Sequence, residues 1–220
     1  MFQAIGAHGP VLGPISSLVL DALLLGVAFW MLSSTKKRNF SDIILFISLI
    51  TVVSLFRVIM TPLPNIQPVT LAALLVGAQL GAKRGIAFAV LVTMISNFII
   101  GDGIWTLYQA IGWSAVAVIG AKSDLVVNNR INYPRIYLAA IGTAFLFDFI
   151  VSLSILDGTV GFSQFMIYLA NGIPYDLMHA LGNLTFAAWF SGWFVRILRH
   201  QPTLDEIEIS VVEGYVIESQ

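Results

Sequence analysis

The sequence has no cysteine, and only 10% of its 220 residues are charged. The absence of cysteine excludes disulfides, Cys-ligated zinc or iron–sulfur centres, and thiol nucleophiles. Hydrophobic residues make up 58% of the chain and the mean hydropathy is +0.89, which leaves too little polar surface for a soluble globular protein. No nucleic-acid-binding surface is indicated. We therefore expect an all-α, polytopic membrane protein embedded in the bilayer of the cell membrane.

Lysine and arginine are missing from every second connection between the hydrophobic stretches. Ten of the 11 basic residues lie in the alternate connections, which are residues 36–38, 83–84 and 122–135 and the stretch that holds Arg196 and Arg199. Short loops rich in Lys and Arg stay cytoplasmic. This pattern predicts that the connections without basic residues, 62–67, 101–104 and 157–164, face outside.

The hydrophobic stretches have the lengths of membrane-spanning helices, because a hydrocarbon core about 30 Å thick needs roughly 20 helical residues. Length and punctuation predict seven transmembrane helices, over residues 14–33, 42–61, 68–82, 85–101, 105–121, 135–156 and 168–198. The third is short, and the last is interrupted at residues 171–174, so that a steeper helix begins near Pro174. The odd number of spans predicts an amino terminus outside and a carboxyl terminus inside.

Three parts of the chain follow from this topology. Residues 1–35 are expected to hold an additional N-terminal transmembrane helix that is not a cleaved signal. Residues 40–199 are expected to form a six-helix membrane core. Residues 200–220 carry five acidic and no basic residues, and we interpret them as an acidic cytoplasmic tail that forms either one strand or a disordered extension.

Several residues that are costly to place in a bilayer fall inside the predicted spans. Such residues usually face a bundle interior or a wet cavity, and here most lie in the outer halves of their helices. Three of them, in the last span, are spaced so that they share one helix face. We expect a polar funnel that opens outward, built from Arg57, Asn97, Asp148, Asp176, His179 and Asn183.

Each of these residues admits a functional and a structural interpretation. Asp176 and His179 either contact a ligand or handle a proton, or else form a structural pair that satisfies the backbone and Arg57. Asp148 lies in the middle of its span and needs a partner, so we interpret Arg57 and Asp148 as structural intramembrane charges. Asn97 is either a site residue or a helix-joining amide.

Aromatic and amide side chains at the start of the fifth span are also candidates for a pocket. Trp105 and Tyr108 are typical of the aromatic belt at a membrane interface. Gln109 and Trp113 are four residues apart and are expected to point deeper into the bundle. Of the four, these two are therefore the better candidates for a pocket.

Two blocks of sequence resemble a known family. The first comprises Pro64-Asn65-Ile66-Gln67-Pro68-Val69-Thr70, Gly77 to Gly81, Lys83-Arg84-Gly85, Ser96-Asn97-Phe98, Gly101, Gly103, Trp105-Thr106, Gln109 and Trp113. The second runs from Gly172 to Asn183. Together they resemble the substrate-specific S component of energy-coupling factor (ECF) transporters. The second block is similar to the final helix of the branch associated with cobalamin or related vitamins.

The resemblance implies a six-helix protein that binds a vitamin, such as cobalamin or a precursor, from outside. It further implies docking to a membrane coupling subunit driven by two cytoplasmic ATPases. The chain has no P-loop, so ATP hydrolysis would come from those other chains. No catalysis, cofactor or metal is implied. The pocket residues that the resemblance implies, with Asn97 added as a further candidate, are Asn65, Gln67, Trp105, Gln109, Trp113, Tyr175, Asp176, His179 and Asn183.

The chain departs from that family in two respects. The span 14–33 and the acidic tail are additional, and the span 42–61 has no Ala or Gly, although small residues at a spacing of four often mark the docking helix. Ala22 and Gly26 on the additional helix do have that spacing. Either the added helix forms the interface, or the protein works alone or with a different partner.

Two other classes of function stay open. Asp176 and His179, with Asp148, could act in a metal-dependent membrane hydrolase, because carboxylate and imidazole on one face can hold a cation or activate water. No HExxH pattern or serine elbow accompanies them. Alternatively, the protein is a non-catalytic subunit of a larger membrane complex, in which the polar residues join helices.

Overall fold

A computed structural model describes residues 5–6, 9–10, 12–35, 39–127, 130–156 and 159–198. The acidic tail 200–220 and the basic residues 36–38 and 199 lie outside the described residues. The predictions for those segments are therefore not addressed by the structure.

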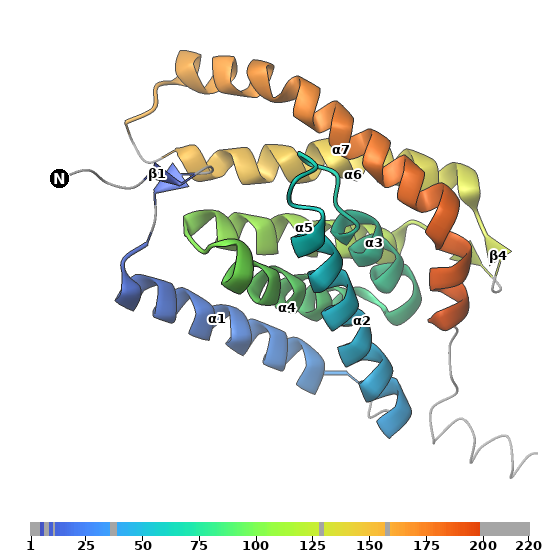
Figure 1. Ribbon diagram of the computed structural model, residues 1–220. Helices are drawn as coiled ribbons and strands as arrows, with labels where there is room; N and C mark the ends of the chain where they lie inside the picture. Colours follow the sequence, from blue (N-terminus) through green and yellow to red (C-terminus); the bar gives the residue numbers. More distant parts are fainter. Residues whose placement is uncertain are drawn as a thin grey trace, which may run out of the picture.

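The described chain is all-helical apart from two minimal hairpins, as predicted (Figure 1). Strands β1 (Ile5–Gly6) and β2 (Gly9–Pro10) pair antiparallel, as do β3 (Val126–Val127) and β4 (Arg130–Ile131). A short 3-10 helix, Leu153–Ile155, follows the sixth helix. The described residues form seven α-helices: α1 (Pro14–Ser33), α2 (Phe40–Ile59), α3 (Val69–Leu80), α4 (Ala82–Ile100), α5 (Ile104–Lys122), α6 (Tyr133–Ser152) and α7 (Phe162–Ile197).

Among the described residues, five helices are long and apolar enough to cross a membrane, namely α1, α2, α4, α5 and α6 with its 3-10 extension. Helix α3 has only 12 residues, which is shorter than the predicted span 68–82. It ends at Gly81, whose φ of 83° is a conformation that glycine adopts without strain. The chain reverses at this residue and α4 begins at the next one.

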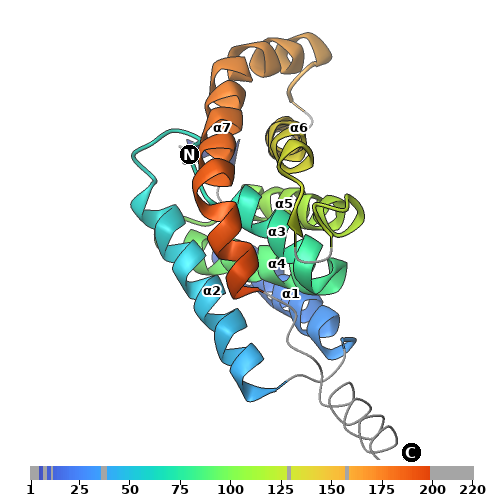
Figure 2. The same ribbon diagram turned by 90° about the vertical axis from the view of Figure 1, so that its right-hand side faces the viewer.

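The predicted interruption of the last span is wrong. Helix α7 begins at Phe162, not near residue 168, and its 36 residues continue across Pro174 without a break. Proline lacks an N–H donor and crowds the preceding turn, so a helix that accommodates it bends. Helix α7 is visibly curved in both ribbon views (Figures 1 and 2). The helix therefore continues across Pro174 instead of beginning there.

Helix α3 lies at the centre of the bundle and contacts α2, α4, α5, α6 and α7. Small residues allow its backbone to approach α5 very closely. A methyl group added at Gly77 would overlap the carbonyl of Ala117, and one added at Gly120 would overlap the carbonyl of Leu74. Without a hydrophobic effect between helices in lipid, such backbone contacts provide much of the packing attraction. Gly77 and Gly120 thus hold the central helix pair together.

Helix α1 packs on the periphery of this bundle, against α4. Its buried residues Leu24 and Ala28 belong to a small apolar cluster with Ala87 and Val90 of α4. Ala22 and Gly26, in contrast, lie on its exposed surface, and nothing approaches within 4 Å of a methyl group placed on Gly26. The small residues of this helix are therefore not used within the chain.

Large apolar side chains cover much of the surface, and several polar side chains are buried inside beside the apolar core. Consecutive residues of α4 show the contrast, since the Phe98 side chain is 90% exposed and Asn97 is 2% exposed. Trp189 on α7 and Ile15 on α1 are likewise exposed. Such a distribution suits a lipid environment, because lipid solvates exposed apolar side chains and polar groups must find partners inside the protein.

Contacts between the connections define two ends of the bundle. At one end, Ser17 of α1 donates a hydrogen bond of 2.5 Å to Asp102 in the connection between α4 and α5. At the other, Lys83 at the start of α4 donates to the carbonyl of Ser34 at 3.2 Å. Connections predicted to share one side of the membrane thus meet each other.

Candidate functional site

Arg57, near the end of α2, is the centre of a buried polar cluster. Its side chain is 3% exposed. The Nε atom donates to Gln67 Oε1 at 3.0 Å, and Nη2 donates to Gln109 Oε1 at 3.1 Å. Nη1 donates to Asn97 Oδ1 at 2.6 Å and also to the Ser96 hydroxyl. The guanidinium therefore joins α2 to α4, α5 and the connection that follows α2.

Trp113 of α5 extends the cluster towards α3. The guanidinium carbon of Arg57 lies 4.8 Å from the centre of the indole ring, a cation–π distance. The indole Nε1 donates to the Thr70 hydroxyl at 3.0 Å. Phe147 of α6 stacks on the indole, with ring centres 4.4 Å apart. Trp113 thus contacts the cation with its face and a polar partner with its edge.

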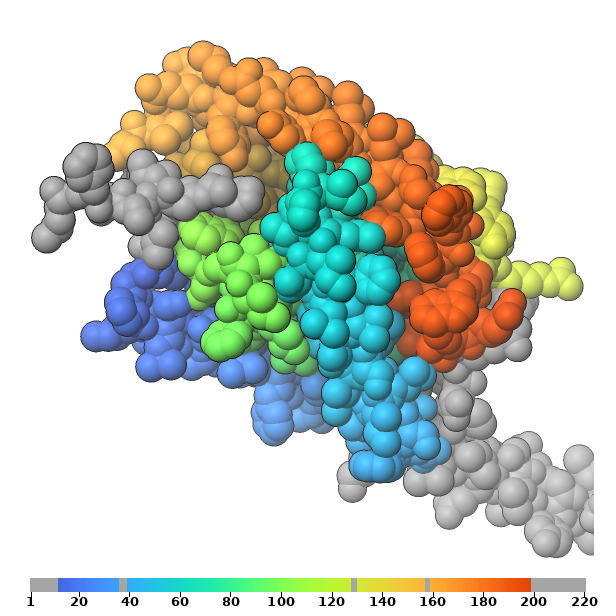
Figure 3. Space-filling model, in the orientation of Figure 1, coloured from blue at the N-terminus to red at the C-terminus, as the bar shows by residue number. Residues whose placement is uncertain are grey.

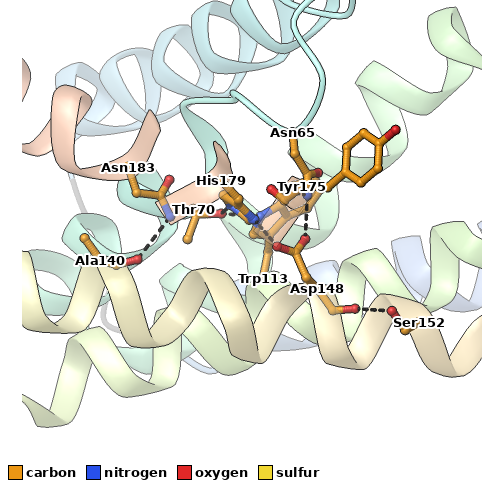
Figure 4. A network of polar contacts seen from close by, with 9 residues as sticks. All are labelled: Asn65, Thr70, Trp113, Ala140, Asp148, Ser152, Tyr175, His179 and Asn183. Atoms are coloured by element: carbon orange, nitrogen blue, oxygen red, sulfur yellow. Dashed lines mark hydrogen bonds and ion pairs between the residues drawn. The ribbon is translucent and has the colours of Figure 1, made fainter. Parts of the chain in front are cut away.

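Thr70 and His179 continue the chain of contacts to a carboxylate. The Thr70 Oγ1 atom lies 2.7 Å from His179 Nε2, and His179 Nδ1 lies 2.9 Å from Asp148 Oδ2. A carboxylate only accepts, so Nδ1 carries the proton that it donates to Asp148. A neutral imidazole then accepts from the Thr70 hydroxyl at Nε2. The three side chains connect α3, α7 and α6, as Figure 4 shows.

Asn65 fastens the connection between α2 and α3 to the two last helices. Its Nδ2 donates to Asp148 Oδ1 at 3.1 Å and to the backbone carbonyl of Tyr175 at 3.2 Å (Figure 4). The residue has a φ of 60°, which asparagine tolerates better than most non-glycine residues. On the molecular surface this connection lies directly beside α7 (Figure 3). Below it, Ile66 packs against Gly182 of α7.

The structure brings most of the predicted site residues into this one cluster. Arg57 and Asp148, predicted as structural charges, belong to it, but Arg57 does not pair with Asp176 or His179 as the structural interpretation supposed. The partner that Asp148 needs is His179. The members among the predicted residues are Arg57, Asn65, Gln67, Asn97, Gln109, Trp113, Asp148 and His179.

Other predicted residues lie at the margin of the cluster. Asp176 is partly exposed, and its carboxyl group is within hydrogen-bonding reach of Asp148. The Tyr175 ring is exposed and points away from Asp148, so only its carbonyl takes part (Figure 4). Trp105 is buried with its ring packed against Gly103. Asn183 is fully buried one turn beyond His179, where its Nδ2 donates to the Ala140 carbonyl at 3.2 Å and its Oδ1 has no hydrogen-bond partner among the described residues.

Several hydroxyl groups of the cluster were not predicted. Thr70 joins Trp113 to His179, and Ser96 accepts from Arg57. Thr106 accepts from Asn97 Nδ2 at 2.8 Å and donates to Asp102. Because Ser17 also donates to Asp102, the cluster extends to the start of α1. Hydroxyls in helices commonly bond to their own backbone, so sequence alone does not separate these from ordinary ones. The proximity of each to a predicted residue was the only signal available.

Hydrogen bonds join the polar side chains directly to one another. The expected funnel is therefore filled by its own side chains, under the connection that holds Asn65 and Gln67. An apolar groove of about 540 Å³ lies instead near the opposite end, between α1, α2 and α4, with Phe46, Ile50 and Leu198 among its lining residues. Among the described residues, no three His, Asp or Glu side chains are placed to hold a metal ion.

Comparison with known families gives one match. A family described as "Family of unknown function (DUF6580)" matches residues 36–204, which covers all helices except α1. The chain belongs to this family. No curated protein and no solved structure matches it.

Proposed function

We propose that this member of the DUF6580 family is the membrane-embedded substrate-binding component of a vitamin uptake system, of the type represented by ECF S components. It would take a vitamin such as cobalamin, or a precursor, from outside the cell membrane. The protein binds and does not catalyse in this proposal. The supporting observation is that all six helices from α2 to α7 contribute side chains to a single polar cluster at one end of the bundle.

The position of the cluster supports binding from outside. Polar side chains inside a membrane protein are costly, so their concentration in one region indicates a functional site. The cluster lies beneath the connection between α2 and α3, which has no basic residue and is predicted to face outside. Asn65 and Gln67 attach this connection through amide hydrogen bonds, which polar groups of a substrate can replace.

The proposed topology has seven crossings with the amino terminus outside. Helices α3 and α7 are added to the five that are long and apolar enough by themselves. Twelve residues of α3 rise only about 18 Å. This helix is nevertheless enclosed by other helices, so its ends need not reach the lipid headgroups. Helix α7, with 36 residues, is amply long.

Partners are proposed from the same resemblance. A membrane coupling subunit with two cytoplasmic ATPases would supply the energy, because the chain itself has no P-loop. The exposed Ala22 and Gly26 on α1 offer a surface where another helix can approach closely. The additional helix is thus a candidate for the contact that α2, without Ala or Gly, does not provide.

A second candidate is a non-catalytic subunit of a larger membrane complex. The observation that favours it is the internal pairing of the cluster, in which Arg57 has protein acceptors for Nε, Nη1 and Nη2. A network that only joins helices would look the same. The two candidates differ in whether a small molecule competes for these bonds.

Mass spectrometry of small molecules retained by gently solubilised protein tests the proposal. Wild-type protein should retain a vitamin or corrinoid, and the His179→Ala variant should retain less of it while inserting normally into the membrane. A wild-type protein that retains no small molecule and binds none from a vitamin panel would favour the structural subunit. Bound metal together with substrate turnover would instead indicate the hydrolase.

A further inference from the structure

The Arg57 guanidinium is a buried charge surrounded by neutral acceptors. Its hydrogen-bond acceptors are three side-chain amide oxygens and one hydroxyl, from Gln67, Asn97, Gln109 and Ser96. The indole face of Trp113 is neutral as well. Within the part of the chain that the structure describes, no carboxylate forms an ion pair with Arg57. The nearby carboxylate of Asp148 is engaged by His179 and Asn65 instead.

A buried cation without a counter-charge is an unusual choice for a structural joint. Removal of a charge from water is costly, and an opposite charge normally compensates for it in protein interiors. Amide dipoles and a cation–π contact replace only part of that compensation. The same helices could have been joined by neutral amides alone. The Arg57 guanidinium thus has no counter-charge among its direct hydrogen-bond partners, and the Asp148 carboxylate of the same cluster is bonded to His179 and Asn65 instead.

Such a site favours a negatively charged oxygen over a neutral one. Arginine binds carboxylate and phosphate groups through paired N–H donors, and these charge-assisted hydrogen bonds are stronger than neutral ones. In a low-dielectric surrounding the difference grows, because the charges are poorly screened. An anion that reached the guanidinium would therefore displace an amide oxygen from it.

Gln67 is the acceptor that can be displaced. It lies in the connection between α2 and α3 and is partly exposed, whereas Asn97, Ser96 and Gln109 are buried on helices. Its Oε1 accepts from Nε. Movement of this one side chain would open the Nε side of the guanidinium towards the end of the bundle that we propose to face outside.

We propose that Arg57 recognises an anionic group of the transported molecule, a carboxylate or phosphate oxygen that takes the place of Gln67 at Nε. This inference rests on the proposed function and narrows it to substrates that carry such a group. Trp113 would support the guanidinium, because its buried ring packs against both Arg57 and Phe147. Residues Asn97 and Gln109 would keep the guanidinium in position.

Two isosteric variants test the inference without removal of Arg57. Gln109→Glu places a carboxylate at an atom that already accepts from Nη2, and Gln67→Glu does so at Nε. Either variant supplies the missing counter-charge from within the protein. Gln67 is partly exposed, so that variant remains useful if the buried one does not fold. Asn39→Asp, at the opposite end of α2, is the matched control for one added negative charge.

The probes are three pairs of vitamins or precursors that differ in charge: the dicyano forms of cobinamide phosphate and cobinamide, biotin and biotin amide, and nicotinate and nicotinamide. Equilibrium binding to each purified full-length protein would be measured in detergent. We expect wild type and Asn39→Asp to bind the anionic member of at least one pair about tenfold or more tightly than its neutral partner. Both glutamate variants should lose that preference. Comparison of the phosphate pair with the two carboxylate pairs shows which of the two anionic groups the protein recognises.

Other results of the binding measurements would contradict the inference, the proposed function or both. Equal affinity for both members of every bound pair, or an anion preference that survives in both folded glutamate variants, would overturn the inference. If wild type binds only neutral probes, the anion site is wrong while the proposed function stands. If wild type binds none of the probes and retains no small molecule on purification, both fail together.

Discussion

Asp148 on α6 and His179 on α7 are joined by a 2.9 Å contact between Oδ2 and Nδ1. Both side chains are almost completely buried, with 10% and 3% of their surfaces exposed. Asp148 uses its other oxygen for Asn65, so a single carboxylate connects two helices and the connection that lies over them. Four predictions follow from this cluster and from the packing around it, beyond the tests of ligand retention and anion preference given above.

Replacement of His179 by alanine should destabilise the protein by about 3 kcal/mol, because it leaves the Asp148 carboxylate buried without its main partner. Thermal unfolding in detergent measures the effect. The double variant Asp148→Asn with His179→Ala is the control, since it removes the stranded charge and should recover part of the loss. Equal losses in the single and double variants would show that the hydrogen bond to Asp148 is not what the histidine provides.

Replacement of Asn65 by glycine should speed substrate release about tenfold and lower the stability by about 1–3 kcal/mol. Glycine adopts the positive φ of this residue without strain but cannot make the two hydrogen bonds to α6 and α7. Dissociation rates of the retained ligand provide the measurement. Asn65→Asp should release the substrate faster still, because it places a second carboxylate beside that of Asp148. An unchanged rate in Asn65→Gly would mean that these bonds do not hold the connection closed.

Gly77→Ala and Gly120→Ala should each destabilise the bundle by roughly 1–3 kcal/mol, the usual cost of overpacking. In each case the added methyl group meets a backbone carbonyl of the neighbouring helix, which cannot rotate away. Gly26→Ala is the matched control, because a methyl group there has open space around it. That variant should unfold at or above the wild-type temperature, since alanine favours helix more than glycine does.

Single cysteines test the proposed topology on a background that has none. Pro64→Cys lies in the exposed connection between α2 and α3, and Ser34→Cys lies in the exposed turn after α1. A membrane-impermeant thiol reagent applied to intact cells should label the first and not the second. Permeabilised cells, in which both are labelled, control for reactivity. Labelling of Ser34→Cys alone would show that the protein has the opposite orientation in the membrane.

The helical class and most helix positions could be predicted from hydropathy, because each stretch is long, apolar and bounded by Gly, Pro or basic residues. The shared face of His179 and Asn183 likewise followed from their spacing, and both are buried. The effect of Pro174 could not be predicted from its position alone. Whether a proline ends or bends a helix depends on neighbouring helices and on the partners of the freed carbonyl.

The hydrogen-bonded pairs between helices could not be predicted from the sequence, for a different reason. Arg57 has Asn97 and Gln109 as acceptors because α2, α4 and α5 meet at the depth where these residues lie. That meeting depends on the close contact of α3 with α5, which a pattern of single glycines does not reveal. Thr70 was overlooked for the same reason, since its role exists only where Trp113 and His179 converge on it.

Helix α7 has no break between His179 and Leu198, which lie about 28 Å apart along the helix axis. Pro174 lies on the other side of His179, so no proline separates these two positions. Leu198 lines the apolar groove at the far end of the bundle. The segment can therefore act as a rigid lever: a swing of about 5° pivoting at the imidazole would carry its tip through roughly 2.5 Å. A ligand that binds beside His179 would in this way move Leu198 at the apolar groove.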